Sequence, residues 1–238
     1  TTNPPTAMTD LGLVTTWTPS PALNYNQTYY WQVVPYNTIG SASDCPVWSF
    51  TTMADPTITS FPHTQNFDGQ DVVVPAMPFG WINIVTSTSS SAYVKTYDSN
   101  SNSTPNCLAF YNYTTSDVLI ASTPVVSGIT TKRVKFFAKS GYRATSLLVG
   151  KMTNPTDQST FTAIGEPIAL TSTYTEYMVE LTPATGNYLA FKHNYGTSSY
   201  RYIYIDNITI EEIPTQPIYT VTPTSKNFGD VEMNTESA

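Results

Sequence analysis

The stretch Tyr200-Arg-Tyr-Ile-Tyr-Ile-Asp-Asn-Ile-Thr-Ile210 carries the clearest structural pattern in the chain. Successive side chains of a β-strand point to opposite faces, so every second residue shares a face. In a strand, the first face would hold Tyr200, Tyr202 and Tyr204. The second would hold Arg201, Ile203 and Ile205. The stretch therefore predicts a long strand with an apolar inner face and a tyrosine-rich outer face.

Further strand candidates lie upstream of this stretch, often about 10 to 15 residues apart and separated by turn residues. This spacing favours an all-β sandwich of the jelly-roll type over alternating strands and helices. With the last stretch, the candidates are Val94–Asp98, Cys107–Tyr113, Val118–Ala121, Arg133–Ala138, Ser146–Lys151, Thr160–Ile164, Thr175–Glu180, Tyr188–His193 and Ile203–Ile210.

The first 53 residues contain three shorter strand candidates, Leu11–Trp17, Thr28–Tyr36 and Val47–Thr52. Alternation within the second predicts that Tyr29, Trp31 and Val33 share a buried face. Leu23 lies six residues before Tyr29, which is the spacing of a tyrosine corner.

Composition and charge narrow the possible functions. Charged residues make up 11% of the 238 residues, the formal net charge is −7, and no Lys or Arg precedes Lys95. A phosphate backbone is bound by clustered cations, so nucleic acid is not an expected partner. No apolar run reaches the roughly 18 residues that a membrane-spanning helix needs, so no transmembrane segment is expected in this fragment. Cys45 and Cys107 are expected to be two separate thiols.

Catalytic motifs are missing from the sequence. The two histidines, His63 and His193, have no partners at metal-ligand spacing, and no nucleophile elbow or phosphate-binding glycine loop occurs. Glycoside hydrolysis needs two carboxylates facing each other across a cleft, and the acidic residues are scattered. We therefore expect a protein that is not an enzyme.

Three motifs stand out between residues 54 and 214: Phe61-Pro-His-Thr-Gln-Asn-Phe-Asp-Gly69, Pro75-Ala-Met-Pro-Phe-Gly-Trp81 and Tyr202-Ile-Tyr-Ile-Asp-Asn-Ile-Thr-Ile210. Together they resemble the cleaved-adhesin, or choice-of-anchor J, domains of bacterial surface proteins, which are similar in shape to MAM domains. The resemblance implies a jelly-roll β-sandwich that acts in cell adhesion.

The flanking segments resemble parts of other modules. Residues 1–53 look like the C-terminal part of a fibronectin type III domain, with Leu23-Asn-Tyr-Asn-Gln-Thr-Tyr-Tyr-Trp-Gln-Val33 as one of its last strands. Residues 215–238 look like the start of an immunoglobulin-like module of the choice-of-anchor D (ASPM/SPD-2/hydin) type. Partial immunoglobulin-like sandwiches on either side would make the chain an internal piece of a longer protein.

Asn66, Asp68 and Asp206 form the candidate metal site. The first and last strands of a jelly roll often lie side by side, which would bring these oxygen-bearing side chains together. Calcium takes six to eight oxygen ligands of this kind, and the family resemblance implies a structural calcium ion. Surface carboxylates or capping hydrogen bonds at strand ends are the alternative. The loop from Asp98 to Thr104 is a weaker calcium candidate, because it lacks the glycine and the distant glutamate of a calcium loop.

Tyr200, Tyr202 and Tyr204 form the candidate glycan- or partner-binding site, because sugars stack on exposed aromatic rings. Packing within the protein is the alternative role for these rings. The basic stretch from Lys132 to Lys139 would be a solvated outer strand face or a patch for a sulfated or carboxylated glycan.

Together these features predict a non-enzymatic, extracellular or cell-surface segment of a bacterial multi-domain protein, acting in adhesion and spacing. Its partners would be a host or environmental glycan or protein, or neighbouring modules of the same protein. Two alternatives remain: a carbohydrate-binding module that targets an attached hydrolase, and a structural subunit of an extracellular filament or layer.

Overall fold

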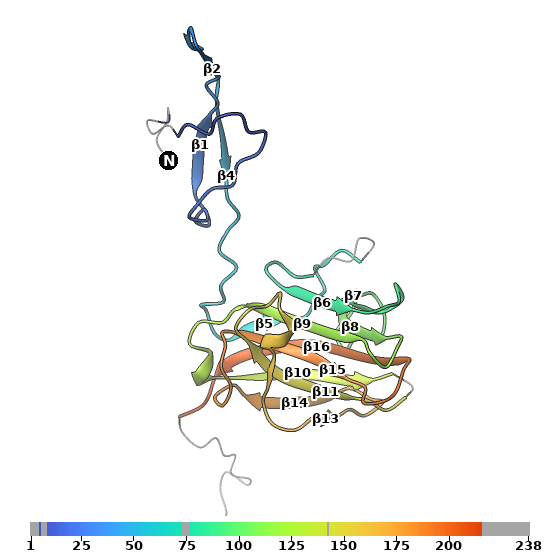
Figure 1. Ribbon diagram of the computed structural model, residues 1–238. Coiled ribbons are helices and arrows are strands. Elements are labelled where there is room, and N and C mark those ends of the chain that lie inside the picture. Colours follow the sequence, from blue (N-terminus) through green and yellow to red (C-terminus); the bar gives the residue numbers. More distant parts are fainter. Residues whose placement is uncertain (1–4, 6–8, 73–76, 142, 216–238) are drawn as a thin grey trace, which may run out of the picture.

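The computed structural model describes residue 5 and residues 9–72, 77–141 and 143–215. Within these residues, the chain forms a small N-terminal unit and a larger β-sandwich joined by an extended linker (Figure 1). The helices of the described residues are two single 3₁₀ turns, η1 (Ile129–Thr131) and η2 (Gln158–Thr160). The fold is therefore all-β, as the sequence predicts. The expected module after residue 214 lies almost entirely outside the described residues.

Two antiparallel sheets form the sandwich. The first, which we call the β16 sheet, runs β14–β10–β16–β8–β7 in space, with β5 also paired to β16. Its strands are β5 (His63–Gln65), β7 (Tyr93–Tyr97), β8 (Cys107–Asn112), β10 (Lys132–Ser140), β14 (Thr175–Glu180) and β16 (Arg201–Glu212).

The second sheet, the β11 sheet, runs β12–β11–β15–β9–β6, with β13 also paired to β11. Its strands are β6 (Ile82–Thr86), β9 (Val118–Val125), β11 (Ser146–Met152), β12 (Thr162–Ala163), β13 (Ile168–Ala169) and β15 (Tyr188–Asn194). Most strands match the sequence candidates to within a few residues. The short strands β5, β6 and β13 were not among those candidates.

The core lies between the two sheets and follows from strand alternation. In β10 the buried residues Val134, Phe136 and Ala138 alternate with half-buried Arg133, Lys135 and Phe137, as expected for a strand covered on one face. The largest fully buried side chains include Phe67, Phe110, Phe136 and Phe191. Each contributes about 1.5–3 kcal/mol of burial free energy, so the core is the main source of stability.

A β-bulge interrupts the alternation of β16. Lys135 of β10 pairs with Thr209, whereas Phe137 pairs with Asp206, so β16 contains one extra residue at this point. Asn207 lies at the bulge and has a φ of 47°, in the left-handed region of backbone conformation. The buried isoleucines of β16 are Ile203, Ile205, Ile208 and Ile210. The bulge explains why two polar residues separate the two isoleucine pairs while all four isoleucines still reach the core.

The N-terminal unit differs from the prediction. It contains β1 (Thr28–Gln32) paired with β4 (Val47–Thr51), and a second small pair, β2 (Tyr36–Asn37) with β3 (Gly40–Ser41). No strand forms over Leu11–Trp17, whose apolar side chains are exposed. At the predicted tyrosine corner, the Asn24 N–H donates a hydrogen bond to Tyr29 Oη at 2.9 Å.

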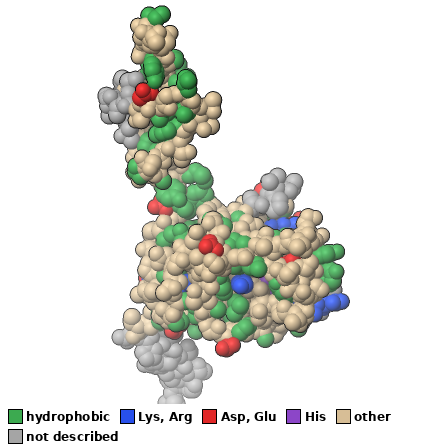
Figure 2. Space-filling view, viewed as in Figure 1, with side chains coloured by type: hydrophobic (Ala, Val, Ile, Leu, Met, Phe, Trp, Pro, Cys, Tyr) green, Lys and Arg blue, Asp and Glu red, His purple; other side chains and the backbone are tan. Residues whose placement is uncertain are grey.

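The prediction that Trp31 and Val33 are buried is wrong, because their side chains are 45% and 58% exposed. Trp31 stacks on Trp48 with ring centroids 4.7 Å apart, and Tyr29 stacks on Phe50 at 5.9 Å. These pairs lie directly across the two strands, but a two-stranded sheet has no second layer in the described residues to cover them. Figure 2 shows the resulting hydrophobic side chains along this unit.

Because Gly80 has no side chain, Pro56 of the linker and Pro124 of β9 can pack closely against it. This close packing gives a stability prediction. Its φ is +76°, and an added Cβ would lie 2.3 Å from Pro56 Cβ and 2.9 Å from Pro124 Cγ. We expect Gly80→Ala to reduce the free energy of unfolding by about 1–3 kcal/mol through crowding, beyond any effect of φ. Gly165→Ala is the control, because Gly165 also has a positive φ but nothing within 4 Å of the added Cβ. Equal denaturation midpoints for the two variants would contradict the crowding argument.

Candidate functional site

Five tyrosines gather on the outer face of the β16 sheet, and we call this surface the tyrosine platform. They come from three neighbouring strands: Tyr93 and Tyr97 on β7, Tyr111 on β8, and Tyr202 and Tyr204 on β16. Strand pairing sets the arrangement, because Tyr93 lies opposite Tyr111 and Tyr111 lies opposite Tyr202. Residues that are far apart in the sequence thus form one surface.

The rings of the platform form a closed circuit of contacts. Tyr111 stacks on Tyr202 with centroids 4.3 Å apart, and Tyr202 lies 6.1 Å from Tyr204 with the rings within 9° of parallel. Tyr97 lies 6.3 Å from both Tyr204 and Tyr93, and Tyr93 lies 5.6 Å from Tyr111. Contacts of this kind each add about 0.5–1.5 kcal/mol beyond the burial of area, so the rings hold one another in place.

Small residues beneath the rings make this packing possible. Ala109 and Cys107 of β8 are both fully buried and belong to the same apolar cluster as Tyr204. Burial raises the pKa of Tyr111 and of Tyr204 to about 12, so both phenols stay neutral hydrogen-bonding groups at physiological pH. Four of the five rings remain half-buried, and Tyr204 is 7% exposed. The platform is therefore a rigid aromatic surface with polar hydroxyl groups.

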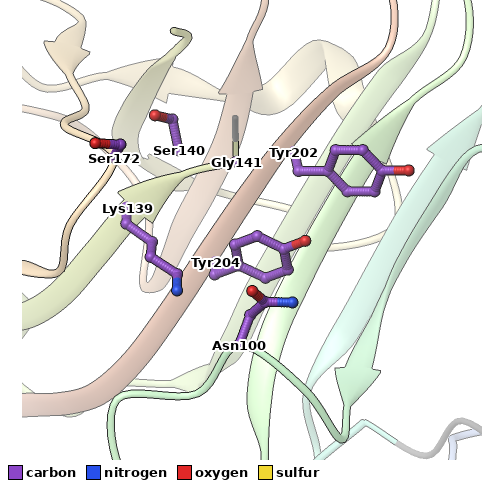
Figure 3. Close-up of a pocket in the computed structure, with 7 residues that line it drawn as sticks. All are labelled: Asn100, Lys139, Ser140, Gly141, Ser172, Tyr202 and Tyr204. Carbon is purple, nitrogen blue, oxygen red and sulfur yellow. The ribbon is translucent and has the colours of Figure 1, made fainter. Parts of the chain in front are cut away.

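An open hollow of about 330 Å³ lies at one edge of the platform. Lys139, Tyr202, Tyr204, Asn100 and Ser172 line it together with Ser140 and Gly141 (Figure 3). Gly141 keeps this edge open, because an added Cβ would lie 3.0 Å from Tyr202 Cβ. The lining combines two aromatic rings, one ammonium group and several neutral polar groups.

Tyr200 lies outside the platform. The sequence pattern groups it with Tyr202 and Tyr204, but β16 begins at Arg201 and Tyr200 has a φ of 58°, which takes it out of the alternation. Its ring instead contacts Tyr113 edge-on, with centroids 5.1 Å apart, and its side chain is 43% exposed. Tyr93, Tyr97 and Tyr111 belong to the site but were not predicted, because their place beside β16 depends on strand pairing.

The three candidate metal ligands lie close together at the bulge of β16. β5 pairs with β16, and the turn after β5 carries Asn66 and Asp68. Asn66 donates from Nδ2 to Asp68 Oδ2 at 2.6 Å. The carboxylate of Asp206 is fully buried and accepts 2.8 Å hydrogen bonds from the N–H groups of Asn102 and Ser103. Asp206 thus ties the loop from Asp98 to Thr104 to the sheet.

Asn106 joins the turn after β5 to the start of β8. The N–H of Asn106 donates to Asp68 Oδ1 at 3.1 Å, and its Nδ2 approaches the carbonyl oxygens of Phe67, Asp68 and Gln70 at 3.2–3.4 Å. The Gln70 N–H also donates to the Phe67 carbonyl at 3.1 Å, so this N–H and the two Nδ2 protons match the three carbonyls. Burial, with repulsion from Asp68, raises the pKa of Asp206 above its ordinary value. In the described ranges, no group of three or more His, Cys, Asp or Glu residues is placed to hold a metal ion.

The two histidines lie on strands of the sandwich, His63 on β5 and His193 on β15. His63 is half-buried in β5, and burial lowers its pKa. His193 is 2% exposed on β15, and its Nε2 lies 3.1 Å from Thr145 Oγ1. Burial, with the nearby charge of Arg201, lowers the pKa of His193 to about 3, so its ring is neutral at physiological pH. Cys45 and Cys107 are both free thiols, as expected.

Comparison with solved structures shows the fold of the sandwich. The K2 cleaved adhesin domain of Lys-gingipain superposes with a TM-score of 0.52 and 16% identity, covering 64% of this chain and 98% of that domain. The K1 cleaved adhesin domain of Lys-gingipain from Porphyromonas gingivalis gives 0.50 and 18%, covering 65% of this chain and all of that domain. The K3 cleaved adhesin domain of Lys-gingipain also superposes with a TM-score of 0.50 and 18% identity. No family model matches the sequence, and no curated protein matches it.

The buried His193 gives a prediction about pH. Because its folded pKa lies below its unfolded pKa, the unfolded chain takes up a proton that the folded chain excludes. The contribution of His193 to stability is therefore complete above about pH 6.5 and is lost as pH falls toward 3. Across this range, the melting temperature should fall more steeply with decreasing pH for the wild type than for His193→Gln. His63→Gln, at the less buried histidine, should flatten the curve less, and parallel wild-type and His193→Gln curves would contradict this account.

Proposed function

We propose that this chain is a non-catalytic, extracellular binding segment whose β-sandwich binds glycans on the tyrosine platform. The observation that carries the proposal is the closed circuit of five tyrosine rings, four of them half-buried, on one outer sheet face. Aromatic rings pack against the apolar faces of sugar rings, while phenol hydroxyl groups bond to sugar hydroxyls. A platform held rigid by its own contacts loses little conformational entropy on binding.

The sheet geometry also suits this role. The platform rests on three paired strands with a fully packed core behind them, so the rings keep fixed spacings. The adhesin-domain fold is compatible with a binding role. A segment of this kind would act at a bacterial cell surface in adhesion, or would direct an attached hydrolase to its polysaccharide.

Substitutions in the platform test the proposal. Affinity electrophoresis in gels that contain xylan, β-glucan, polygalacturonate or dextran sulfate would identify a retarding glycan. Tyr111→Ala and Tyr202→Ala should each weaken binding about two- to tenfold, because each removes one ring of the stacked pair. Tyr188→Ala is the control, because Tyr188 is a half-buried tyrosine on the other sheet. Mobilities that change equally in all three variants would argue against the platform.

A structural calcium ion at the β16 bulge is a second element of the proposal. The fit rests on the kinds of atoms present, which are two carboxylates that repel each other and three backbone carbonyls. Asn66, Asp68 and Asp206 would be its side-chain ligands, and carboxylate and carbonyl oxygens suit this cation. A bound cation would offset the repulsion between Asp68 and Asp206 and tie three segments of the chain together.

A thermal melt with millimolar calcium and then with chelator tests the ion. Binding to the folded state raises the melting temperature in proportion to the logarithm of calcium concentration once the site is saturated. We expect a rise of several degrees that Asp68→Asn abolishes. Asp157→Asn is the control, because Asp157 caps η2 away from this corner. Identical melts with calcium and with chelator would remove the ion from the proposal.

Contact between modules is an alternative function that one observation favours. The exposed aromatic pairs across β1 and β4 form an apolar face that the described residues leave uncovered. Such a face suits packing against a neighbouring module, as in an extracellular filament or layer.

A further inference from the structure

Two lysines flank the tyrosine platform in one row of the sheet. Strand pairing places Lys95 opposite Ala109, Ala109 opposite Tyr204, and Tyr204 opposite Lys139. The row crosses four strands, so the two lysine Cα atoms are about 14 Å apart at the usual strand spacing. Both side chains project from the outer face of the β16 sheet, one on each side of the rings.

The aromatic rings hold both ammonium groups in place. Lys95 Nζ lies 4.6 Å from the ring centre of Tyr93 and 5.5 Å from that of Tyr97. Lys139 Nζ lies 4.7 Å from the ring centre of Tyr174 and 5.5 Å from that of Tyr204. Cation–π contacts of this kind orient a cation without neutralising its charge. The two charges therefore remain available to a ligand.

The other basic residues of β10 form ion pairs with glutamates of β16. Lys132 pairs with Glu212 at 2.8 Å, while Arg133 and Lys135 pair with Glu211 at 2.6 and 2.7 Å. Within the described ranges, neither Lys95 nor Lys139 forms an ion pair. A chain with a formal net charge of −7 thus keeps two uncompensated cations beside its aromatic surface. The basic stretch from Lys132 to Lys139 accordingly divides into three ion-paired residues and Lys139, which has no ion pair within the described ranges.

Nearby carboxylates do not compensate these lysines. Asp98 and Asp206 both act electrostatically on Cys107, which lies beneath the platform. Asp206 is fully buried and accepts three backbone N–H groups, from Asn102, Ser103 and Asn207. Neither carboxylate lies within ion-pair distance of Lys95 or Lys139. The exposed Asp98 lies near the platform but forms no ion pair with either lysine, so both ammonium groups stay accessible to a ligand.

We infer that the tyrosine platform binds an anionic polysaccharide, with sugar rings against the tyrosines and acidic groups against Lys95 and Lys139. This inference rests on the proposed glycan-binding function and names its ligand class. An ammonium group donates charge-assisted hydrogen bonds to carboxylate or sulfate oxygens. The hollow beside Lys139 offers one such position, with Tyr202, Tyr204, Asn100 and Ser172 around it (Figure 3). Two separated cations favour a polymer with repeated acidic groups over a single acidic sugar.

Matched ligands test the charge requirement. Titration calorimetry would compare oligogalacturonate with its methyl ester, in which methylation of the carboxylates removes their charge, and dextran sulfate with dextran. We expect the anionic member of at least one pair to bind about tenfold or more tightly than its neutral partner, with affinity falling as salt rises. The pair that shows the difference tells whether carboxylate or sulfate is recognised.

Matched variants locate the charges. Lys95→Met and Lys139→Met keep the length and apolar stem of the side chain, and each should weaken binding of the anionic ligand about tenfold, and more than binding of its neutral partner. Lys192→Met is the control, because Lys192 Nζ also lies over an aromatic ring, 5.3 Å from the centre of Phe161, but on the other sheet. Thermal melts would show that the three variants fold equally.

The outcomes separate the two proposals. If charged and neutral ligands bind alike and the lysine variants match the wild type, the anionic inference is wrong while glycan binding stands. If Tyr111→Ala and Tyr202→Ala leave all glycan binding unchanged, the platform is not the site and both proposals fall. An absence of binding to every ligand by the wild-type chain would also overturn both.

Discussion

The buried carboxylate of Asp206, together with the bulge beside it, is the constraint on which the rest of the sandwich depends. A buried charge is tolerated only when it is well hydrogen-bonded, and Asp206 accepts N–H groups from Asn102, Ser103 and Asn207. Those bonds fix the loop that leads into β8. The extra residue in β16 meanwhile keeps its isoleucines in the core on both sides of the bulge. The bulge thus sets the register of the central strand, and the carboxylate fixes the loop between β7 and β8.

The two faces of β16 consequently have different roles. The inner face contributes four buried isoleucines to a core shared with the β11 sheet. The outer face contributes Tyr202 and Tyr204 to a surface shared with β7 and β8. Because the strand is central and paired on both sides, the outer rings inherit the rigidity of the core. The proposed recognition surface therefore needs no loop to position it, unlike the binding sites of many β-sandwiches.

Local sequence pattern was sufficient for the sheet elements of the sandwich but not for the whole candidate site. Alternation located β10 and β16 and the apolar faces of both, because one face of each is covered. The partners of Tyr202 were missed, because Tyr93 and Tyr111 meet it only through strand pairing across about 100 residues of chain. Lys151 was also unexpected as a fully buried residue, since only the structure reveals that its ammonium donates to the Leu181 carbonyl at 2.7 Å. In the N-terminal unit, the same alternation gave a wrong prediction of burial for Trp31 and Val33. Burial requires a second layer, which the described residues do not supply.

The placement of Cys107 beneath the tyrosine rings has a consequence for the chemistry of the thiol. Its sulfur is fully buried, and burial raises the pKa of the thiol to about 12, so almost none of it is the reactive thiolate at neutral pH. An oxidising environment would ordinarily convert an unpaired cysteine into mixed disulfides or sulfur acids. Here the aromatic surface shields the sulfur from oxidants, so the chain can keep a small, polarizable side chain under its rings without a disulfide partner. Any opening of the platform would expose that sulfur, and its rate of alkylation would then report how often the rings separate.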